Sequence, residues 1–336
     1  MFKRILVPLD GSARAERALS VAARMARSSE GTIILIQAMN VSAIYGPALV
    51  PYSTVTPEML ENEQENAKSY LAQVAASPLL AGIATETFVD QGEAASVILA
   101  AAESYTADVI VLCSHGRSGF ARWALGSVAE KIIHHAAIPV LVLREKGPMP
   151  AGPHPDPTMP LRVLVPLDGS VLAKAALEPA AMLIAALATP ARGELHLIRI
   201  VPSKGRGAAD YDLASQHARV YLEQTTEHLR EGVTAPAVAR LHVPITWSVV
   251  MADDVASALI GAAESGEEGS AISTRSDLIA MATHGRQGFQ RWTMGSVTER
   301  VLHATRLPLL IVRPAAMQSK QKKQEATEKV ASLERP

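Results

Sequence analysis

Two loops of this 336-residue chain place glycine and serine at the same spacing. Nine residues separate Gly116 from Gly126-Ser127, and nine separate Gly285 from Gly295-Ser296. Glycine lets backbone N–H groups approach a ligand closely, and the start of a helix adds unpaired N–H groups and a positive dipole end. The two loops therefore predict anion sites suited to phosphate groups, with N-capping by the two serines as the alternative.

Two aspartates stand at the end of a strand-like segment and directly before Gly-Ser. They are Asp10 and Asp168. A carboxylate at this place can accept hydrogen bonds from ribose or adenine, or help to hold a metal-bound phosphate. The alternative is that each caps the helix that follows. Because Ser12 and Ser170 are also able to cap, we favour ligand contact for the aspartates.

Other side chains recur in the two glycine loops, namely Arg117, Arg122, Arg286, Arg291, Phe120, Trp123, Phe289 and Trp292. The arginines fit either screening of phosphate charge or solvated loop positions, and the aromatic residues fit packing. Neither His115 nor His284 has a second histidine, cysteine or carboxylate at metal-ligand spacing, so we predict no metal site. No catalytic constellation can be argued from the order of Ser, His, Asp and Cys. Cys113 is predicted to be a small buried residue, with redox sensing as the weaker alternative.

The loops belong to a duplicated unit. The stretch Leu6–Ser12 returns unchanged as Leu164–Ser170, and residues 115–144 return as 284–313 with half of the positions identical. A repeat this long is a duplicated domain and not a solenoid. We predict a first copy at 1–146, a proline-rich linker at 147–160, a second copy at 161–314 and a charged, disordered tail at 315–336.

Composition narrows the class of protein. Hydrophobic residues make up 48% and aromatic residues 4%, and the net charge is −1, which gives no electrostatic drive toward nucleic acid or an anionic membrane. The single cysteine excludes an internal disulfide and fits a reducing compartment. We find no signal-peptide pattern and no apolar run of about 18 residues, so we expect a soluble cytoplasmic protein.

Each copy alternates short β-rich runs with longer helical ones, and continuous apolar strands predict a doubly wound α/β domain around a parallel sheet. Ligands of such sheets bind beyond the carboxyl ends of the strands, where both repeated motifs fall. The fifth strands, Pro139–Leu143 and Leu307–Val312, are expected to pair edge to edge about a pseudo-twofold axis. The other strands predicted in the first copy are Arg4–Leu9, Thr32–Ala38, Ala84–Val89 and Val109–Ser114, and the helices are Ala13–Arg27, Glu58–Ala76, Ala94–Tyr105 and Ser127–His135.

These motifs resemble the universal stress protein family. The resemblance rests on Pro-Leu-Asp-Gly-Ser after a first strand, His-Gly-Arg-x-Gly after a fourth and Gly-Ser-Val-x-Glu before the last, in the same order in both copies. It implies two tandem five-stranded, Rossmann-like domains of the adenine nucleotide alpha hydrolase type, which bind ATP, with or without Mg, through Gly-x2-Gly-x9-Gly-Ser/Thr. The first glycine of that pattern is replaced here by Cys113 and Ala282. Asp253 in place of Gly92, and an insertion at 265–276, add to the differences between the copies.

The resemblance implies a set of nucleotide-binding residues in each copy. In the first copy they are Asp10, Ala38, Cys113, His115, Gly116, Arg117, Gly119, Gly126, Ser127 and Val128. In the second copy they are Asp168, Ile200, Ala282, His284, Gly285, Arg286, Gly288, Gly295, Ser296 and Val297.

Three functions remain open. The first is a cytoplasmic ATP-binding protein of stress response or signalling, whose bound nucleotide biases a surface read by an unidentified protein partner. The second is a slow ATPase or related nucleotide-using enzyme, for which the sequence offers no base beyond Asp10 and Asp168. The third is a structural module with vestigial loops, which the two replaced glycines favour. Each of these three functions is compatible with dimerisation, in which the chain pairs with a second copy of itself.

Overall fold

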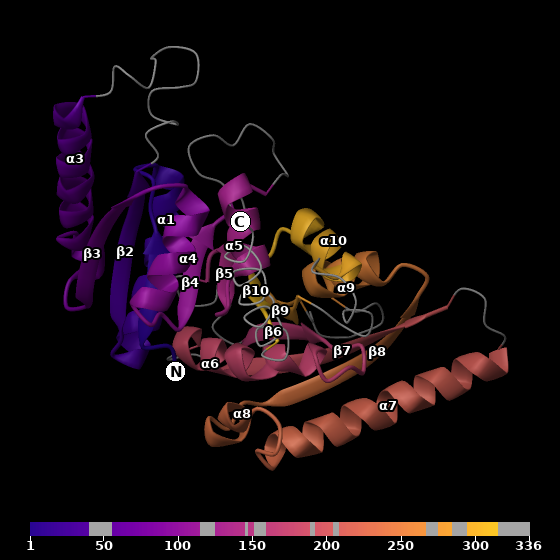
Figure 1. The fold of residues 1–336 in the computed structure, drawn as a ribbon. Helices are drawn as coiled ribbons and strands as arrows, with labels where there is room; N and C mark the ends of the chain where they lie inside the picture. The colour runs from indigo at the N-terminus through magenta and orange to yellow at the C-terminus, as the bar shows by residue number, and fades with distance from the viewer. Residues whose placement is uncertain are drawn as a thin grey trace, which may run out of the picture.

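The computed structural model describes residues 1–39, 56–114, 125–144, 147–150, 159–188, 192–203, 208–266, 275–283 and 294–314. They form a ten-stranded sheet in the order β3-β2-β1-β4-β5-β10-β9-β6-β7-β8, with the two copies side by side (Figure 1). None of the helices in these ranges is long and apolar enough to cross a membrane. The predicted tail lies outside the described residues.

The elements alternate in both copies as the sequence predicts. The first copy comprises β1 (Arg4–Pro8), α1 (Ala13–Ser29), β2 (Thr32–Met39), α3 (Pro57–Ala75), the 3-10 turn η2 (Pro78–Leu80), β3 (Ala84–Gln91), α4 (Ala94–Ser104), β4 (Val109–Cys113), α5 (Ser127–His135) and β5 (Val140–Leu143). The second comprises β6 (Leu161–Pro166), η3 (Ala173–Ala176), α6 (Leu177–Leu187), β7 (Gly193–Pro202), α7 (Ala208–Arg230), α8 (Pro236–Arg240), β8 (Ile245–Ala252), α9 (Val255–Ser265), β9 (Leu278–Ala282), α10 (Ser296–Ala304) and β10 (Leu309–Val312).

Prolines account for small departures from the predicted bounds. The fifth strands begin one residue after Pro139 and Pro308, which lack the N–H that a ladder requires. Pro179 lies in the first turn of α6, where its missing N–H costs no intrahelical bond, and the 3-10 turn η3 precedes it. The first copy has no proline here, and α1 begins directly at Ala13.

The sheet is parallel within each copy and antiparallel where the copies meet. Strand β1 pairs with β2 on one side and β4 on the other, and β6 pairs with β7 and β9 in the same way. Between the copies, β5 and β10 run antiparallel, with Leu141 opposite Leu310. The predicted edge-to-edge pairing of the fifth strands is therefore confirmed.

Apolar layers cover both faces of the sheet and continue from one copy into the other. One face packs against α1, α3, α6 and α7, and the opposite face against α4, α5, α9 and α10. Helices α1 and α6 also meet directly, where the Ser28 hydroxyl donates to the Ala185 carbonyl at 3.2 Å. The two copies thus share their cores as well as a strand pairing.

Two buried arginines cross between the copies. Arg144 follows β5 and donates through Nη2 to the Leu302 carbonyl of α10, while Arg313 follows β10 and donates through Nη1 to the His135 carbonyl of α5 at 3.4 Å. Each arginine is 8% exposed. Burial lowers the pKa of Arg144 to about 10, and the carboxylate of Glu264 opposes that shift. Each arginine therefore satisfies a carbonyl near the end of the other copy's last helix.

Ion pairs hold the starts of α4 and α9 to the neighbouring helices. Glu93 caps α4 by accepting from the Ser96 N–H at 3.0 Å, and it pairs with Lys131 of α5 at 3.1 Å. In the second copy Asp254 caps α9 and accepts both guanidinium N–H groups of Arg300 of α10, at 2.8 and 2.5 Å. Hydrogen bonding from Ser96 holds the pKa of Glu93 at about 2. In the second copy, hydrogen bonds from Arg300 lower the pKa of Asp254 from its ordinary value.

We expect the crossed arginines to stabilise the fold. Because the substitutions remove a buried hydrogen bond to Leu302 and a partly buried one to His135, Arg144→Met and Arg313→Met should each lower the free energy of unfolding by about 1–3 kcal/mol. The exposed Arg219 is the control, and Arg219→Met should change it by less than about 0.5 kcal/mol. Urea unfolding measures all three, and equal, small effects would show that the crossed bonds contribute nothing.

The Glu93–Lys131 pair should give a small, pH-dependent stabilisation. Since the folded-state pKa of Glu93 lies below its ordinary 4.5, the contribution is present above pH 4.5 and is lost as the pH falls toward 2. Both partners are about half exposed, so Glu93→Gln should cost less than about 1 kcal/mol at pH 7. Urea unfolding from pH 7 to 2 should show the difference from wild type shrinking, with Glu65→Gln as an exposed control. A difference that is constant over this range contradicts the assignment.

Candidate functional site

The candidate site of each copy lies where the strand order changes direction. The ends of β1 and β4 are adjacent because these strands pair, and the same holds for β6 and β9. The chain beyond β1 stays next to β2, since the Leu9 N–H donates to the Ile36 carbonyl at 2.8 Å. Asp10, Cys113 and Ala38 therefore belong to three neighbouring strand ends, as do Asp168, Ala282 and Ile200.

The aspartate of each site is held by the serine two residues later. The Asp10 carboxylate accepts from the Ser12 N–H at 3.0 Å and from its hydroxyl at 2.6 Å, while Ser12 Oγ accepts from the Ala15 N–H at 3.2 Å. In the second copy Asp168 accepts from the Ser170 N–H at 2.9 Å, and Ser170 Oγ accepts from the Ala173 N–H. In the first copy Ser12 therefore carries the helix-capping bond, whereas in the second copy Ser170 bonds the first residue of η3, whose N-cap Leu172 has no side-chain cap bond. In both copies the aspartate orients the serine.

A glycine makes each of these turns possible. Gly11 has φ +80° and Gly169 has φ +90°, a left-handed conformation that other residues rarely adopt. Nothing lies within 4 Å of a Cβ added at Gly11. The backbone angle therefore accounts for this glycine, because the turn leaves room for a side chain.

Glycines also cap the two helices that were expected to face phosphate. Gly126 and Gly295 are the N-caps of α5 and α10, with extended backbone angles and no side-chain cap bond. Their N–H groups donate to the Ser114 and Thr283 carbonyls at 2.8 Å, which anchors each helix start to the end of β4 or β9. The alternative that Ser127 and Ser296 are N-caps is thus wrong.

The residues after these caps divide between solvent and core. Ser127 and Ser296 are the first helical residues and are exposed, while Val128 and Val297 pack against the apolar layer. Because the first N–H groups of a helix have no intrahelical acceptor, both helix starts present backbone donors beside an exposed hydroxyl. This arrangement suits an anionic group.

The two replaced glycines end their strands in ordinary extended conformation. Cys113 pairs with Leu143 and Ala282 with Val312, and neither residue has a positive φ. Cys113 forms no disulfide and is partly exposed, which corrects the expectation of a buried cysteine, whereas Ala282 is 7% exposed. The copies also differ in the helix that follows. The Thr298 hydroxyl of α10 donates to the Ala282 carbonyl at 3.0 Å, whereas α5 has Ala129, which has no hydroxyl, at the equivalent position.

Much of both glycine loops lies outside the described residues. This applies to His115, Gly116, Arg117, Gly119, Phe120, Arg122, Trp123, His284, Gly285, Arg286, Gly288, Phe289, Arg291 and Trp292. Their expected contacts with a ligand remain predictions. Asp253, which lies in the described part, accepts a hydrogen bond from the Ser203 hydroxyl.

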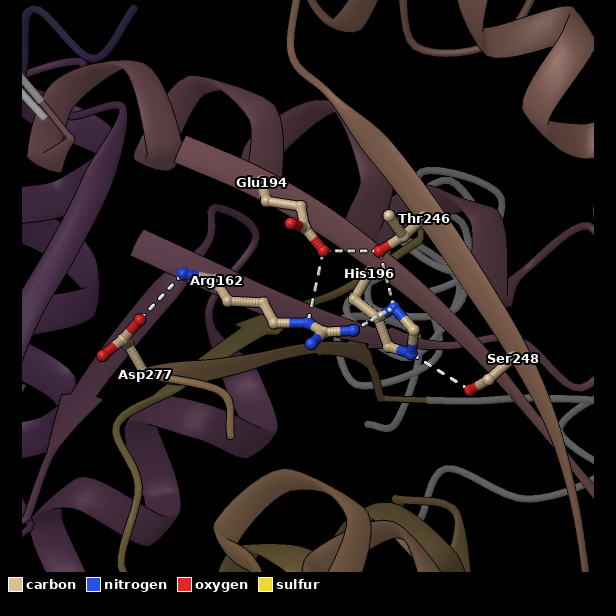
Figure 2. Close-up of polar contacts among 6 residues, drawn as sticks. All are labelled: Arg162, Glu194, His196, Thr246, Ser248 and Asp277. Carbon is tan, nitrogen blue, oxygen red and sulfur yellow. Dashed lines mark hydrogen bonds and ion pairs between the residues drawn. The ribbon is translucent and has the colours of Figure 1, made fainter. Parts of the chain in front are cut away.

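A polar network that sequence reasoning missed lies in the second copy (Figure 2). His196, 4% exposed, contacts Arg162 Nη2 through Nδ1 at 2.6 Å and Ser248 Oγ through Nε2 at 3.0 Å. Because a guanidinium only donates, Nδ1 accepts, and the proton on Nε2 is directed to Ser248. Glu194 pairs with Arg162 at 3.4 Å and accepts from Thr246 Oγ1 at 2.5 Å.

The network belongs to the packing of the sheet and not to the candidate site. Arg162 is the second residue of β6 and Glu194 the second of β7, so the network lies toward the amino ends of the strands, away from Asp168. By strand register His196 corresponds to Ile34 of the first copy, which is fully buried. A histidine within an apolar strand is the sequence signal for such a polar network. Its partners can be identified only when the strand register is known.

Comparisons with known proteins agree with the fold and the motifs. The universal stress protein family model matches residues 1–144 and 159–313. A universal stress protein from Mycolicibacterium smegmatis is 26% identical over 321 residues, covering 92% of this chain and 97% of that protein. One from Synechocystis is 29% identical over 151 residues, covering 43% of this chain and 98% of that protein.

A solved structure supports the arrangement of both copies. The crystal structure of a universal stress protein from Archaeoglobus fulgidus has a TM-score of 0.62 and 20% identity, over 92% of this chain and 98% of that one. At this identity the likeness concerns the fold alone. Together with the repeated match of the family model, it shows that the chain belongs to the universal stress protein family and carries two of its domains in tandem.

Proposed function

We propose that this protein binds an adenine nucleotide, ATP, at the carboxyl edge of each domain and acts in stress response or signalling through nucleotide-dependent conformation. The observation that carries the proposal is the pair of glycine-capped helix starts at Gly126 and Gly295, each anchored to a strand end at 2.8 Å. Backbone donors at a helix start stabilise phosphate oxygens through hydrogen bonds and the helix dipole.

The remaining contacts follow the strand ends. We assign the phosphates to α5 and α10, where Ser127 and Ser296 add hydroxyl donors, and ribose or adenine to Asp10 and Asp168. The backbones at Ala38 and Ile200 face adenine in this assignment. Mg, if it accompanies ATP, neutralises phosphate charge and is held by the nucleotide itself in this scheme.

The replaced glycines are compatible with such a site. Cys113 and Ala282 lie in regular strand ladders without positive φ, so the backbone at these positions does not require glycine. What the side chains change is the space above the strand end, and a thiol takes more of it than a methyl group. We therefore expect the second domain to bind ATP more tightly than the first.

Binding, and not turnover, is the function proposed. Hydrolysis needs a general base aimed at an attacking water. The Asp10 carboxylate accepts two hydrogen bonds from Ser12, and Asp168 accepts the matching bond from Ser170. Both carboxylates are thereby oriented as fixed hydrogen-bond acceptors, which suits the hydroxyls of a sugar. The bound nucleotide then biases the surface that a partner reads, to the extent that one conformation binds it better.

Replacing the capping glycines tests the proposal. Their φ values of −67° and −62° are open to valine, so Gly126→Val and Gly295→Val should fold normally while a branched side chain covers the helix start. Each variant should lose one site, with affinity there falling at least about tenfold because charge-assisted hydrogen bonds are lost. Isothermal titration calorimetry with ATP and magnesium measures the number of sites and the affinity of each variant.

Gly261→Val is the matched control. Gly261 lies in α9, and nothing stands within 4 Å of a Cβ added there. This variant should bind ATP as the wild type does. Unchanged ATP binding in the combined Gly126→Val and Gly295→Val variant would contradict the assignment of phosphate to the helix starts.

A further inference from the structure

The continuous sheet ends in two outer strands, β3 in the first domain and β8 in the second (Figure 1). Among the described residues neither strand has a further strand on its outer side. An edge strand offers a row of backbone donors and acceptors on which another chain can pair. Because β3 and β8 occupy equivalent places in the repeat, their residues can be compared position by position.

Alternate residues of both strands direct their backbone groups away from the sheet. The Leu195 N–H of β7 donates to the Pro244 carbonyl just before β8 at 2.8 Å, and the Gly92 N–H just after β3 donates to the Met39 carbonyl of β2 at 3.0 Å. Successive peptide groups of a strand point to opposite sides, so the even-numbered residues of β3 and β8 face the neighbouring strand. The odd-numbered residues therefore have outward backbone groups.

Strand register aligns the two edges. Ile34 and His196 are equivalent, and they pair with Glu86 of β3 and Thr246 of β8. The outward residues of β3 are Thr85, Thr87, Val89 and Gln91, and those of β8 are Ile245, Trp247, Val249 and Met251. One edge is thus largely polar, whereas the other is apolar throughout.

The edge of β3 carries groups that hinder pairing. The carboxylate of Asp90 accepts from the outward N–H of Gln91 at 2.8 Å, so this donor is already occupied. Glu86, which pairs with Arg4 at 3.1 Å, adds a second charge to the strand. Charged side chains are a common means by which edge strands avoid pairing with another chain. The first domain therefore has a protected edge.

The edge of β8 has no such protection. Val250 stands where β3 has Asp90, and it offers no acceptor to the outward N–H of Met251. The Met251 side chain is 37% exposed, and Trp247 and Val249 pack only partly against the apolar layer. An uncharged strand of eight residues, rich in β-formers and with donors directed outward, is a site for strand pairing.

We propose that β8 pairs antiparallel with β8 of a second copy of this chain. Directly opposite residues of such a pair point to the same face of the sheet, so the twofold axis must pass through a residue and not between two. An axis at Ser248 uses all of the outward residues. It puts Trp247 opposite Val249, an aromatic ring against a β-branched side chain, and Ile245 opposite Met251. Each of these pairs exchanges two backbone hydrogen bonds.

The molecule itself favours a second copy as the partner. The chain already joins its equivalent fifth strands, β5 and β10, in the same antiparallel manner. Pairing through β8 continues the ten-stranded sheet into that of the second copy and leaves only the protected β3 edges at the ends. Since β8 carries no charge and the net charge of the chain is −1, little repulsion opposes the approach of two copies. An edge pairing buries less surface than a standard interface, so we expect a dissociation constant in the micromolar range.

Giving β8 the residues of the protected edge tests the pairing. The variant V250D/M251Q introduces the side chains that β3 has at the equivalent places, Asp90 and Gln91. The new carboxylate should cover the outward N–H of residue 251, as Asp90 does for residue 91. Both positions are at least partly exposed, so the variant should fold as the wild type does.

The control L213Q/V220D makes matching changes on α7, where the two side chains are 52% and 44% exposed. Sedimentation equilibrium, from micromolar to submillimolar protein, should show the wild type and the control forming dimers with the same dissociation constant. V250D/M251Q should weaken the dimer at least about tenfold, because backbone hydrogen bonds and apolar contacts of the new ladder are lost.

Hydrogen exchange locates the contact without a variant. As the wild-type concentration rises through the dissociation constant, the amides of Trp247, Val249 and Met251 should exchange more slowly. The outward amides of β3, at Thr87 and Val89, should exchange at an unchanged rate. This comparison still decides if V250D/M251Q folds poorly.

A wild type that stays monomeric at every concentration would overturn the proposal. A dimer that V250D/M251Q and the control weaken equally, or a dimer without slower exchange in β8, would also overturn it, because the contact would then lie elsewhere. If a different polypeptide co-purifies with the wild type and is lost from V250D/M251Q, the edge binds that partner and the second copy is the wrong occupant. None of these results bears on nucleotide binding, which is assigned to the starts of α5 and α10.

Discussion

The antiparallel pairing of β5 with β10 is the interaction on which the rest of the architecture depends. It converts two parallel sheets into one ten-stranded sheet and removes an exposed edge from each domain. It also brings the residue after each strand, Arg144 or Arg313, against the last helix of the other domain. Since those helices begin at the candidate phosphate sites, the same pairing relates the two sites by an approximate twofold.

A shared backbone carries different side chains in the two domains. Both have the same strand order, glycine-capped helix starts and aspartate turns held by serine. Yet the first has Ile34 where the second buries His196 in a polar network, and Cys113 where the second has Ala282. The backbone geometry is retained because packing and pairing require it, while side chains differ both in the buried sheet, as at His196, and at the candidate site, as at Cys113 and Ala282.

Much of this arrangement could be predicted from sequence, because local patterns determine it. The bounds of α5 and the pairing of the fifth strands agree with prediction, since apolar runs, glycine and proline act locally. What could not be predicted depends on register or on neighbours. The sequence leaves Ser127 open as an alternative N-cap, and only the geometry assigns the cap to Gly126. Likewise, nothing in the order of residues brings Arg144 to the Leu302 carbonyl.

The proposed function requires each domain to hold an adenine nucleotide at the carboxyl edge of its sheet. The most direct measurement is to denature the purified protein and to identify and count the small molecules released, before and after loading with ATP and magnesium. We expect adenine nucleotide at up to two per chain, with the second domain filled first if only one is found. No nucleotide, together with no uptake of added ATP, would contradict it and leave a structural module with altered loops.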